Sequence, residues 1–415
     1  MKTIYKCAAG LFSIGVIALL LAALYLQTVL PDSFYVAQGE ELDLSSQYSN
    51  IICSMKKNHF PVEAYSAAGN SYTMNLKLLG FVDIKDVNVQ VVDRRVVSVS
   101  GAPFGVKMFT EGVMVVGMGA VQTTSSAISP AKEAGIQQGD VILSINGETE
   151  LSNRTIGKIV NASAGKNVFV KVSRGGKVMD FTVTPALAVT DNQYHIGLWV
   201  RDSSAGIGTL TFYDTNTQMF AGLGHAICDV DTGQILPLSQ GQIVHATITG
   251  VTPGQSGSPG ELQGSFTDNA PWGQVYLNNV NGVYGKFSTA PAGGIVMPMA
   301  MSHEVEPGPA YIYTTVNGQN PQRYEIEIEK INPIQEEPGR NMVIRITDPR
   351  LLSASGGIVQ GMSGSPIVQN NMLVGAVTHV FVNDPTHGYG IFAENMDNTL
   401  HNAAASARVD TKAAS

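Results

Sequence analysis

Residues 361–380 read GMSGSPIVQNNMLVGAVTHV, and this stretch decides the fold class of the chain. Ser363 stands between two glycines, so the backbone can turn tightly on both sides of a nucleophilic hydroxyl. After Pro366 a short apolar run reaches Asn370-Asn371, a pair that favours a tight hairpin turn, and a second apolar run returns as a strand. The stretch therefore predicts an exposed serine followed at once by a β-hairpin.

This pattern resembles the nucleophile loop of trypsin-like serine proteases. The resemblance implies that Ser363 is the nucleophile and that the amides of Gly361 and Ser363 form the oxyanion hole. A second copy of the short string occurs at residues 254–259, with Ser256 in the serine's place, but polar sequence follows it. Ser256 and the neighbouring Ser365 stay as rivals, and a turn without chemistry is the remaining alternative.

The catalytic base is expected to be His225, which lies in AGLGHAI between small residues that let an imidazole project into a cleft. Its place upstream of the serine fits the His–acid–Ser order of trypsin-like enzymes. Asp348 stands fifteen positions before Ser363, at a predicted strand end, and is the expected acid that orients the imidazole. Asp229 and Asp231 are rivals, although their closeness to His225 suggests that they shape its loop.

The strand after the nucleophile carries Thr378, His379 and Val380. Trypsin-like enzymes pair this strand with the substrate backbone, so these three residues are expected to bind substrate. His379 is predicted to line the first specificity pocket and to favour a Gln or Glu side chain. The alternative is a structural histidine that faces its own barrel.

Short apolar runs separated by Gly, Asn and Asp-Pro turns fill residues 187–415, as in a β-barrel or sandwich. Residues 61–100 also show alternating, Val-rich runs. With 44 glycines and only 14% charged residues, the fold class is mostly β. The formal net charge of −8 without a basic run argues against a nucleic-acid partner.

Residues 101–186 contain the string AGIQQGDVILSING, which resembles PDZ domains of the bacterial protease-associated type. The family binds the carboxylate of a peptide at a loop of backbone amides, while the peptide adds a strand to the domain's edge. The matching loop is expected at Phe104-Gly105-Val106. The alternative is a spacer domain that never binds a free C-terminus.

No charged residue occurs in the 24 residues from Cys7 to Leu30, a length that can cross a bilayer as one helix. Lys2 and Lys6 precede the run, which places the tail in the cytoplasm and the rest outside. A cleaved signal peptide is the alternative. We expect a tail and transmembrane anchor at residues 1–32, a small β-module and linker at 33–100, a PDZ domain at 101–186 and a peptidase domain at 187–415.

The three cysteines, Cys7, Cys53 and Cys228, include no CxxC pair, so the sequence predicts neither a metal site nor a cofactor. A disulfide could join only Cys53 and Cys228, and two unrelated thiols are the open alternative.

The order of an anchor, a β-module, a PDZ domain and the motifs GLGHAI, TDPRLL, QGMSGSPI and GAVTHVFVNDPTHGYGIF resembles the stage IV sporulation protein B peptidases. The resemblance implies a trypsin-like double β-barrel with His225, Asp348 and Ser363 as the triad. It also implies a protease in the forespore intermembrane space that cleaves itself and cuts a regulatory membrane protein, which activates sigma-factor processing during endospore formation.

A second interpretation stays open: a PDZ scaffold with an inactive protease-like domain that recruits membrane partners. The two readings differ in whether His225 and Ser363 are used chemically.

Overall fold

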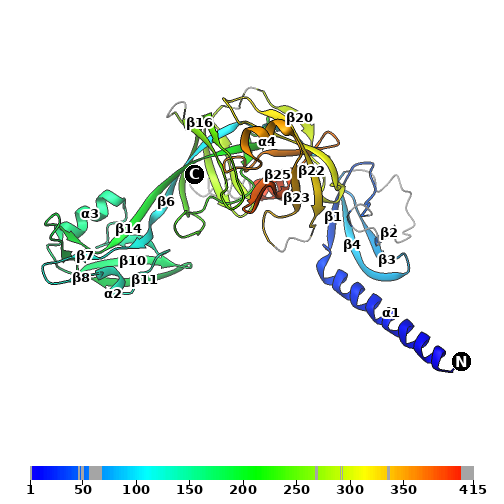
Figure 1. Cartoon of the computed structure of the whole chain (residues 1–415), viewed down its shortest axis with the longest axis horizontal. Helices are drawn as coiled ribbons and strands as arrows, with labels where there is room; N and C mark the ends of the chain where they lie inside the picture. The colour runs from blue at the N-terminus through cyan, green and yellow to red at the C-terminus, as the bar shows by residue number, and fades with distance from the viewer. Residues whose placement is uncertain are drawn as a thin grey trace.

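The computed structural model describes residues 2–44, 47, 51–55, 68–266, 270–289, 291, 293–333 and 337–402. The fold is mostly β, as predicted. Figure 1 shows an elongated molecule, with a small unit around α3 at one end, two barrels in the middle, and α1 with its attached sheet at the other end.

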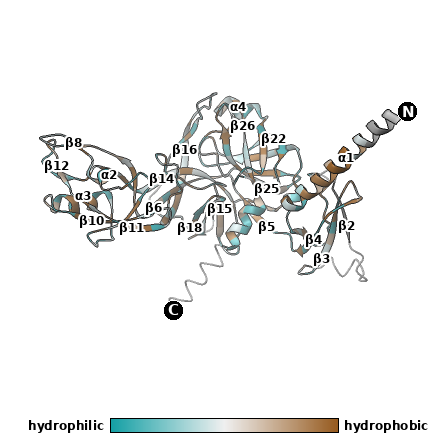
Figure 2. Cartoon of the chain, turned by 90° about the horizontal axis from the view of Figure 1, so that it is seen from below, coloured by the Kyte–Doolittle hydropathy of each residue, from teal (hydrophilic) through white to brown (hydrophobic). Residues whose placement is uncertain are grey.

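The helix α1 (Lys2–Val29) leads into a four-stranded sheet. Its Gly10–Val29 stretch is 20 residues long, apolar and largely uncovered by protein, so it is long enough to cross a membrane. Figure 2 shows the brown, apolar stretch of this helix at one end of the molecule, next to the attached sheet, against whose core Leu19 and Leu26 pack. The sheet order is β1-β4-β3-β2, with β1 and β4 parallel. The strands are β1 (Ser33–Ala37), β2 (Ile51–Met55), β3 (Ser71–Leu78) and β4 (Val82–Val92).

Both β1 and β2 lie in a part of the chain whose sequence is largely polar, and both join this sheet. Each strand has only five residues and polar segments flank it in sequence, so the strands are recognisable only from their partners. Side chains such as Phe34, Val36 and Leu76 are buried in the core of the sheet.

The first barrel is a ring of six strands in the order β6-β16-β18-β19-β15-β14, closed by pairing of β14 with β6. Phe104, Phe212, Phe220 and Phe287 are among its fully buried side chains. The strands are β6 (Pro103–Met118), β14 (Leu198–Tyr213), β15 (Met219–Gly222), β16 (Leu238–Thr252), β18 (Gly273–Asn279) and β19 (Gly282–Phe287).

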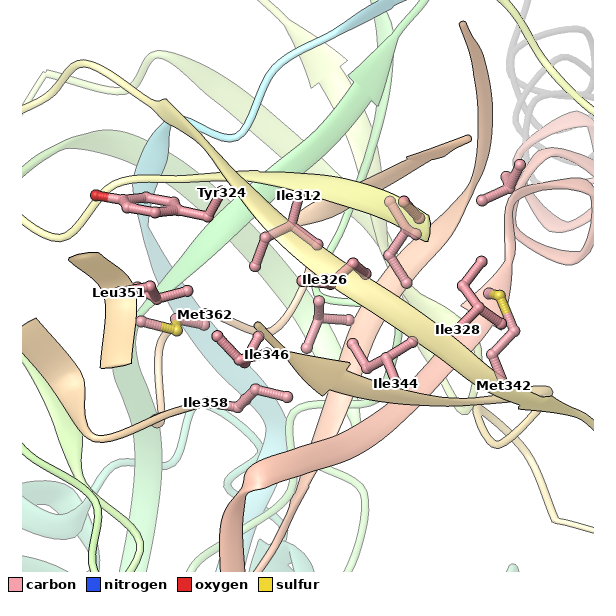
Figure 3. Packing of buried hydrophobic residues seen from close by; sticks show 14 of the residues in the cluster. Ile312, Tyr324, Ile326, Ile328, Met342, Ile344, Ile346, Leu351, Ile358 and Met362 are labelled. Carbon is pink, nitrogen blue, oxygen red and sulfur yellow. The ribbon is translucent and has the colours of Figure 1, made fainter. Parts of the chain in front are cut away.

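The second barrel is closed in the order β21-β22-β23-β26-β25-β24. Isoleucines from alternate positions of its strands fill the interior, and Figure 3 shows them together with Met342, Met362 and Tyr324. The predicted hairpin after Pro366 is confirmed, since Gln369 pairs with Met372 across a two-residue turn. The strands are β21 (Gly308–Thr314), β22 (Gln322–Ile331), β23 (Met342–Ile346), β24 (Pro366–Gln369), β25 (Met372–Phe381) and β26 (Asp384–Phe392).

The unit around α3 extends the sheet of the first barrel through β9, β10 and β11. A hairpin turns at Gly175-Gly176, where Arg174 pairs with Lys177. The helix α3 follows Ser152 and begins with a capping box between Ser152 and Thr155. The elements are β7 (Val121–Gln122), β8 (Ala127–Ile128), α2 (Pro130–Glu133), β9 (Val141–Ile145), α3 (Asn153–Ala162), β10 (Val168–Arg174), β11 (Lys177–Val183), β12 (Ala186–Leu187) and β13 (Tyr194–His195).

Two long strands, β6 and β14, belong to both this unit and the first barrel (Figure 1). Leu198 pairs with Met118 at the α3 end, and Thr209 pairs with Pro103 in the barrel. Boundaries at residues 101 and 187 therefore separate sequence segments, whereas in space the two units share one continuous ribbon.

The remaining elements connect these parts. They are β5 (Val96–Val99), β17 (Glu261–Phe266), β20 (Ile295–Pro298), a short 3₁₀ turn at Ser302–Glu304, α4 (Pro349–Ser355) and a helical segment over residues 393–402.

Candidate active site

The glycines around Ser363 hold the backbone in a tight, left-handed loop. Gly361 has φ +96° and Gly364 has φ +94°, a region that residues with a side chain rarely adopt. A Cβ atom at position 364 would stand 2.0 Å from the Thr209 carbonyl oxygen. The loop thus needs glycine at position 364 for both conformation and space.

The first barrel fastens this loop through β14. The Thr209 amide donates to the Ser363 carbonyl (3.0 Å), and the Thr209 hydroxyl donates to the Gly361 carbonyl (2.8 Å). The buried Thr211 hydroxyl donates to the Gly364 carbonyl (2.7 Å). Three carbonyls of the loop are therefore satisfied by the opposite barrel, which holds the loop at the junction of the two.

The amides of Gly361 and Ser363, predicted to form the oxyanion hole, donate to no group in the part of the chain that the structure describes. Their neighbours do have acceptors: Met362 donates to Val359 and Gly364 to Val377. Two unpaired donors beside a nucleophile can stabilise the negative charge of a tetrahedral intermediate. The assignment of these two amides stays a prediction.

Ser363 lines a cleft of about 780 Å³ together with His225. Its hydroxyl donates to the carbonyl of Thr378 (2.7 Å), so the proton of the nucleophile is held by β25 in this structure. Thr378, His379 and Val380 line the same cleft. The cleft thus contains the predicted nucleophile, the predicted base and the three predicted substrate-binding residues.

His225 follows two residues in the left-handed region, Leu223 (φ +66°) and Gly224 (φ +69°). Its Nδ1 lies 2.8 Å from the carbonyl of Ala226. If Nδ1 carries the proton and donates to this carbonyl, Nε2 is left as the acceptor, which is the tautomer that a general base needs. Burial lowers the pKa of the imidazole, and this favours the neutral form.

His379 lies directly against His225, with 5.0 Å between the ring centroids. A register shift between Val377 and Val380 leaves Thr378 and His379 without partners on β26, so His379 can turn into the cleft. Burial and the neighbouring His225 lower the pKa of His379 to about 4.

Asp348 is not brought together with His225 and Ser363, and it is absent from the residues that line the cleft. It is the N-cap of α4: its Oδ1 accepts from the amide of Arg350 (2.9 Å), and its Oδ2 accepts from the Arg350 guanidinium (2.7 Å). Its Oδ2 also accepts from the amide of Glu325 (3.2 Å). Arg350 holds the pKa of this carboxyl at about 2, so Asp348 is ionised, and its oxygens are already bonded to Arg350 and to the amide of Glu325.

Asp229 is the carboxylate that does line the cleft among the described residues. Its Oδ1 accepts from the amides of Asp231 and Thr232, and Oδ2 lies 2.9 Å from the guanidinium of Arg201 on β14. These contacts agree with the expectation that Asp229 shapes the loop after His225.

The two rival serines have structural contacts. Ser365 is fully buried and donates to the carbonyl of Met362 (2.7 Å). Ser256 is on the rim of the cleft, where its hydroxyl donates to the carbonyl of Asn383. Pro259, the last residue of the second copy of the string, lines the cleft.

The sequence did not point to one wall of the active-site cleft, the wall opposite β25. It consists of the middle of β14, Ser204 to Gly208, together with Ile358, Val359 and Gln360 before the nucleophile. The small residues of SAGIG were the available signal, since only short side chains leave an open cleft there.

The predicted carboxylate loop at Phe104-Gly105-Val106 is wrong as a loop, because these residues lie inside β6. They pair with β14 on one side and β16 on the other, and Phe104 is fully buried in the first barrel. A strand with both edges occupied cannot offer amides to a peptide.

A groove of about 440 Å³ lies in the unit around α3, between α3 and the segment from Tyr194 to Val200.

Cys228 also lines the active-site cleft and is a free thiol, so the possible Cys53–Cys228 disulfide is absent. Among the described residues, no three His, Cys, Asp or Glu side chains gather as a metal site.

Comparison with known proteins finds two family models. Residues 192–397 match the SpoIVB peptidase S55 family, and residues 87–184 match the PDZ domain family. Curated relatives described as probable periplasmic serine endoprotease DegP-like, from Brucella suis and Brucella melitensis, are 34% identical over 116 residues, which is 27% of this chain. The chain spans 22% of the length of these relatives.

Two solved structures are similar in part. The active form of the Rv3671c protease from M. tuberculosis is 15% identical with a TM-score of 0.31, covering 48% of this chain and 74% of that one. The PDZ domain of an SdrC-like protein from Listeria monocytogenes is 20% identical with a TM-score of 0.18, covering 22% of this chain and 87% of that one.

Proposed function

Because the chain is a serine peptidase of the S55 family that carries a PDZ domain, we propose that it is a membrane-anchored endopeptidase of endospore formation. It cleaves itself and then cuts a regulatory membrane protein, which activates sigma-factor processing. The apolar helix α1 retains it in the membrane, with the catalytic part in the forespore intermembrane space. The family match supports this proposal, and so does the order of the anchor, the unit around α3 (called the PDZ unit below) and the peptidase barrels.

One observation carries the chemical part of the proposal: Ser363 and His225 line one cleft, and the amides of Gly361 and of Ser363 itself have no acceptor among the described residues. In the proposed reaction, His225 takes the proton of Ser363 as its oxygen attacks the scissile carbonyl, and later gives a proton to the leaving amine. The amides of Gly361 and Ser363 stabilise the oxyanion. Asp348 is the proposed acid. This role requires the Asp348 carboxylate to leave the Arg350 guanidinium and to accept a hydrogen bond from His225 in the active form.

The test is active-site labelling of the full chain in detergent with a fluorophosphonate, followed by mass spectrometry of the modified peptide. We expect the label on Ser363. A wild-type chain that stays unlabelled and intact on storage would favour the inactive scaffold. A label on Ser256 or Ser365 would show that the labelled serine, and not Ser363, is the nucleophile.

The pH profile reports the base. His225 acts only when neutral, and burial lowers its pKa below the usual 6.5. A lowered pKa means that protonation sets in only at more acidic pH, so we expect kcat/KM to stay level as pH falls to 6.5 and then to decline. His379, with a pKa of about 4, stays neutral as the pH falls to 6.5 and becomes protonated only near the acid end of the profile. Measurement between about pH 4 and 9 checks this, and an acid limb centred above 6.5 contradicts it.

His379 is proposed to favour Gln or Glu before the scissile bond, because its ring lines the cleft next to His225. We expect H379A to lower kcat/KM for Gln and Glu peptides by about tenfold relative to matched Ala and Leu peptides. H379Q, which keeps a hydrogen-bonding side chain, is the control and should retain part of the preference. A library profile that H379A leaves unchanged refutes the role.

A further inference from the structure

One strand, β14, lines both the groove of the PDZ unit and the active-site cleft. Its first residues, Leu198 to Val200, line the groove with α3, and its middle, Ser204 to Gly208, lines the cleft with Ser363. Figure 1 shows β14 running from the α3 unit into the barrels. The two sites are therefore connected by a single uninterrupted stretch of backbone.

The outer edge of this stretch has no partner strand among the described residues. Residues 198–209 pair with β6 on one side, and pairing with β15 on the other side begins only at Leu210. No other described strand covers the edge between residues 198 and 208. An open strand edge presents amides and carbonyls that can take up an extended peptide as an added strand.

The groove has an end that suits a carboxylate. In the loop before β14, the carbonyls of Ile196 and Gly197 accept from the amides of Ala131 and Gly119. The amides of Ile196 and Gly197 themselves donate to no group in the described part of the chain. Gly197 has φ +75°, which lets the two amides face outward together, and paired backbone amides of this kind capture C-terminal carboxylates.

The helix α3 forms the opposite wall and is fixed to the strand. The amide of Asn153 at its start donates to the Asp202 carboxylate (3.0 Å), and Tyr194 donates to Asn161 at its other end (3.0 Å). Between these ties, Ile156, Gly157 and Val160 line the groove. The groove therefore accepts an apolar side chain next to the carboxylate.

The direction of a bound peptide follows from the loop. A peptide antiparallel to β14 with its carboxylate at residues 196–197 places its preceding residues successively beside Val200, Ser204 and Ile207, toward Ser363. Residues before the scissile bond would then lie on β25, and those after it on β14, the facing wall of the cleft.

We propose that the free edge of β14, residues 198–208, is one substrate track. The substrate is a protein with an accessible, apolar C-terminus, and the bond that Ser363 attacks lies about ten residues before its terminal carboxylate. Leu198 to Ile207 is a stretch of ten residues, and the nine steps between them correspond to about 30 Å of extended chain. The reaction is peptide-bond hydrolysis with water as the second reactant. This inference rests on the proposed peptidase function.

The test uses the full chain in detergent and peptides that share one scissile sequence. One series varies the distance from the scissile bond to a free apolar C-terminus, and a matched series ends in an amide. We expect kcat/KM to peak near ten residues and to be at least about tenfold higher than for the matched amide, mainly through KM. Peptides four residues longer or shorter should lose this advantage.

A groove variant separates the track from the cleft. Gly157 lines the groove, and no atom lies within 4 Å of a Cβ added there, so G157L introduces an apolar side chain at the groove wall. We expect G157L to abolish the advantage of the free carboxylate, whereas K158L, on the exposed face of α3, retains it.

Fluorophosphonate labelling of Ser363 is measured in parallel. Absence of the label refutes the peptidase function itself. Normal labelling with equal rates for acid and amide peptides, or without a dependence on length, refutes only the track.

Discussion

S363A abolishes peptidase activity and self-cleavage of the chain, with a loss of kcat on the order of 10⁶-fold. The expected loss is large because Ser363 is the oxygen nucleophile, the amides of Gly361 and Ser363 have no acceptor in the described part of the chain, and no other described hydroxyl of the loop can replace that of Ser363. Ser365 is buried and its hydroxyl is already donated to Met362. The measurement is turnover of a fluorogenic peptide by the full chain in detergent.

The chain offers a matched control for this substitution in S256A, which alters the same sequence string at its second copy. Ser256 donates to Asn383 on the rim and is not a residue that lines the cleft, so S256A should turn over peptide and label normally. Circular dichroism and thermal unfolding of both variants show whether the fold is retained. If S363A retains activity and S256A loses it, the two copies have been assigned in the wrong order.

D348N lowers kcat by about 10⁴-fold, if Asp348 exchanges partners to orient His225, because the amide cannot stabilise the imidazolium. Asn is as good an N-cap as Asp, so α4 should remain folded and the variant tests charge and not the helix. Kinetics of D348N, with thermal unfolding beside it, measures the two effects separately.

R350Q is the companion variant. In the structure, the Arg350 guanidinium is the competing partner of the Asp348 carboxylate and holds its pKa at about 2. Removing it frees the carboxylate, so R350Q should equal or exceed the wild-type rate while D348N is inactive. Full activity in D348N would mean that Asp348 only caps α4 and that the site works without this acid.

Features of the chain that depend on neighbours in sequence were predictable. The loop around Ser363 follows from glycines that alone adopt its left-handed turns, and the hairpin after it follows from Asn370 and Asn371, both at positive φ. The capping box of α3 and the uncharged length of α1 are equally local signals. Each of these is decided by the conformational preferences of a few consecutive residues.

Features that depend on distant strands were not predictable. Phe104 to Val106 has the composition of a peptide-binding loop, yet pairing with β14 and β16, about 100 and 140 residues later, buries it in a barrel. Asp348 looks like a strand-end acid, but Arg350 and the amide of Glu325 occupy its oxygens. The contact of His379 with His225 likewise joins two barrels.

The sequence alone thus determined the nucleophile loop, the apolar anchor helix and the mostly β class, because glycine turns, hydrophobic length and strand-forming runs are written in adjacent residues. Only the tertiary structure decided which strand edges stay open, which carboxylate is already paired, and that β14 connects the groove of the PDZ unit to the cleft of Ser363. A strand's partners are chosen by packing over the whole chain, and the same run of residues can be a buried wall or a free edge.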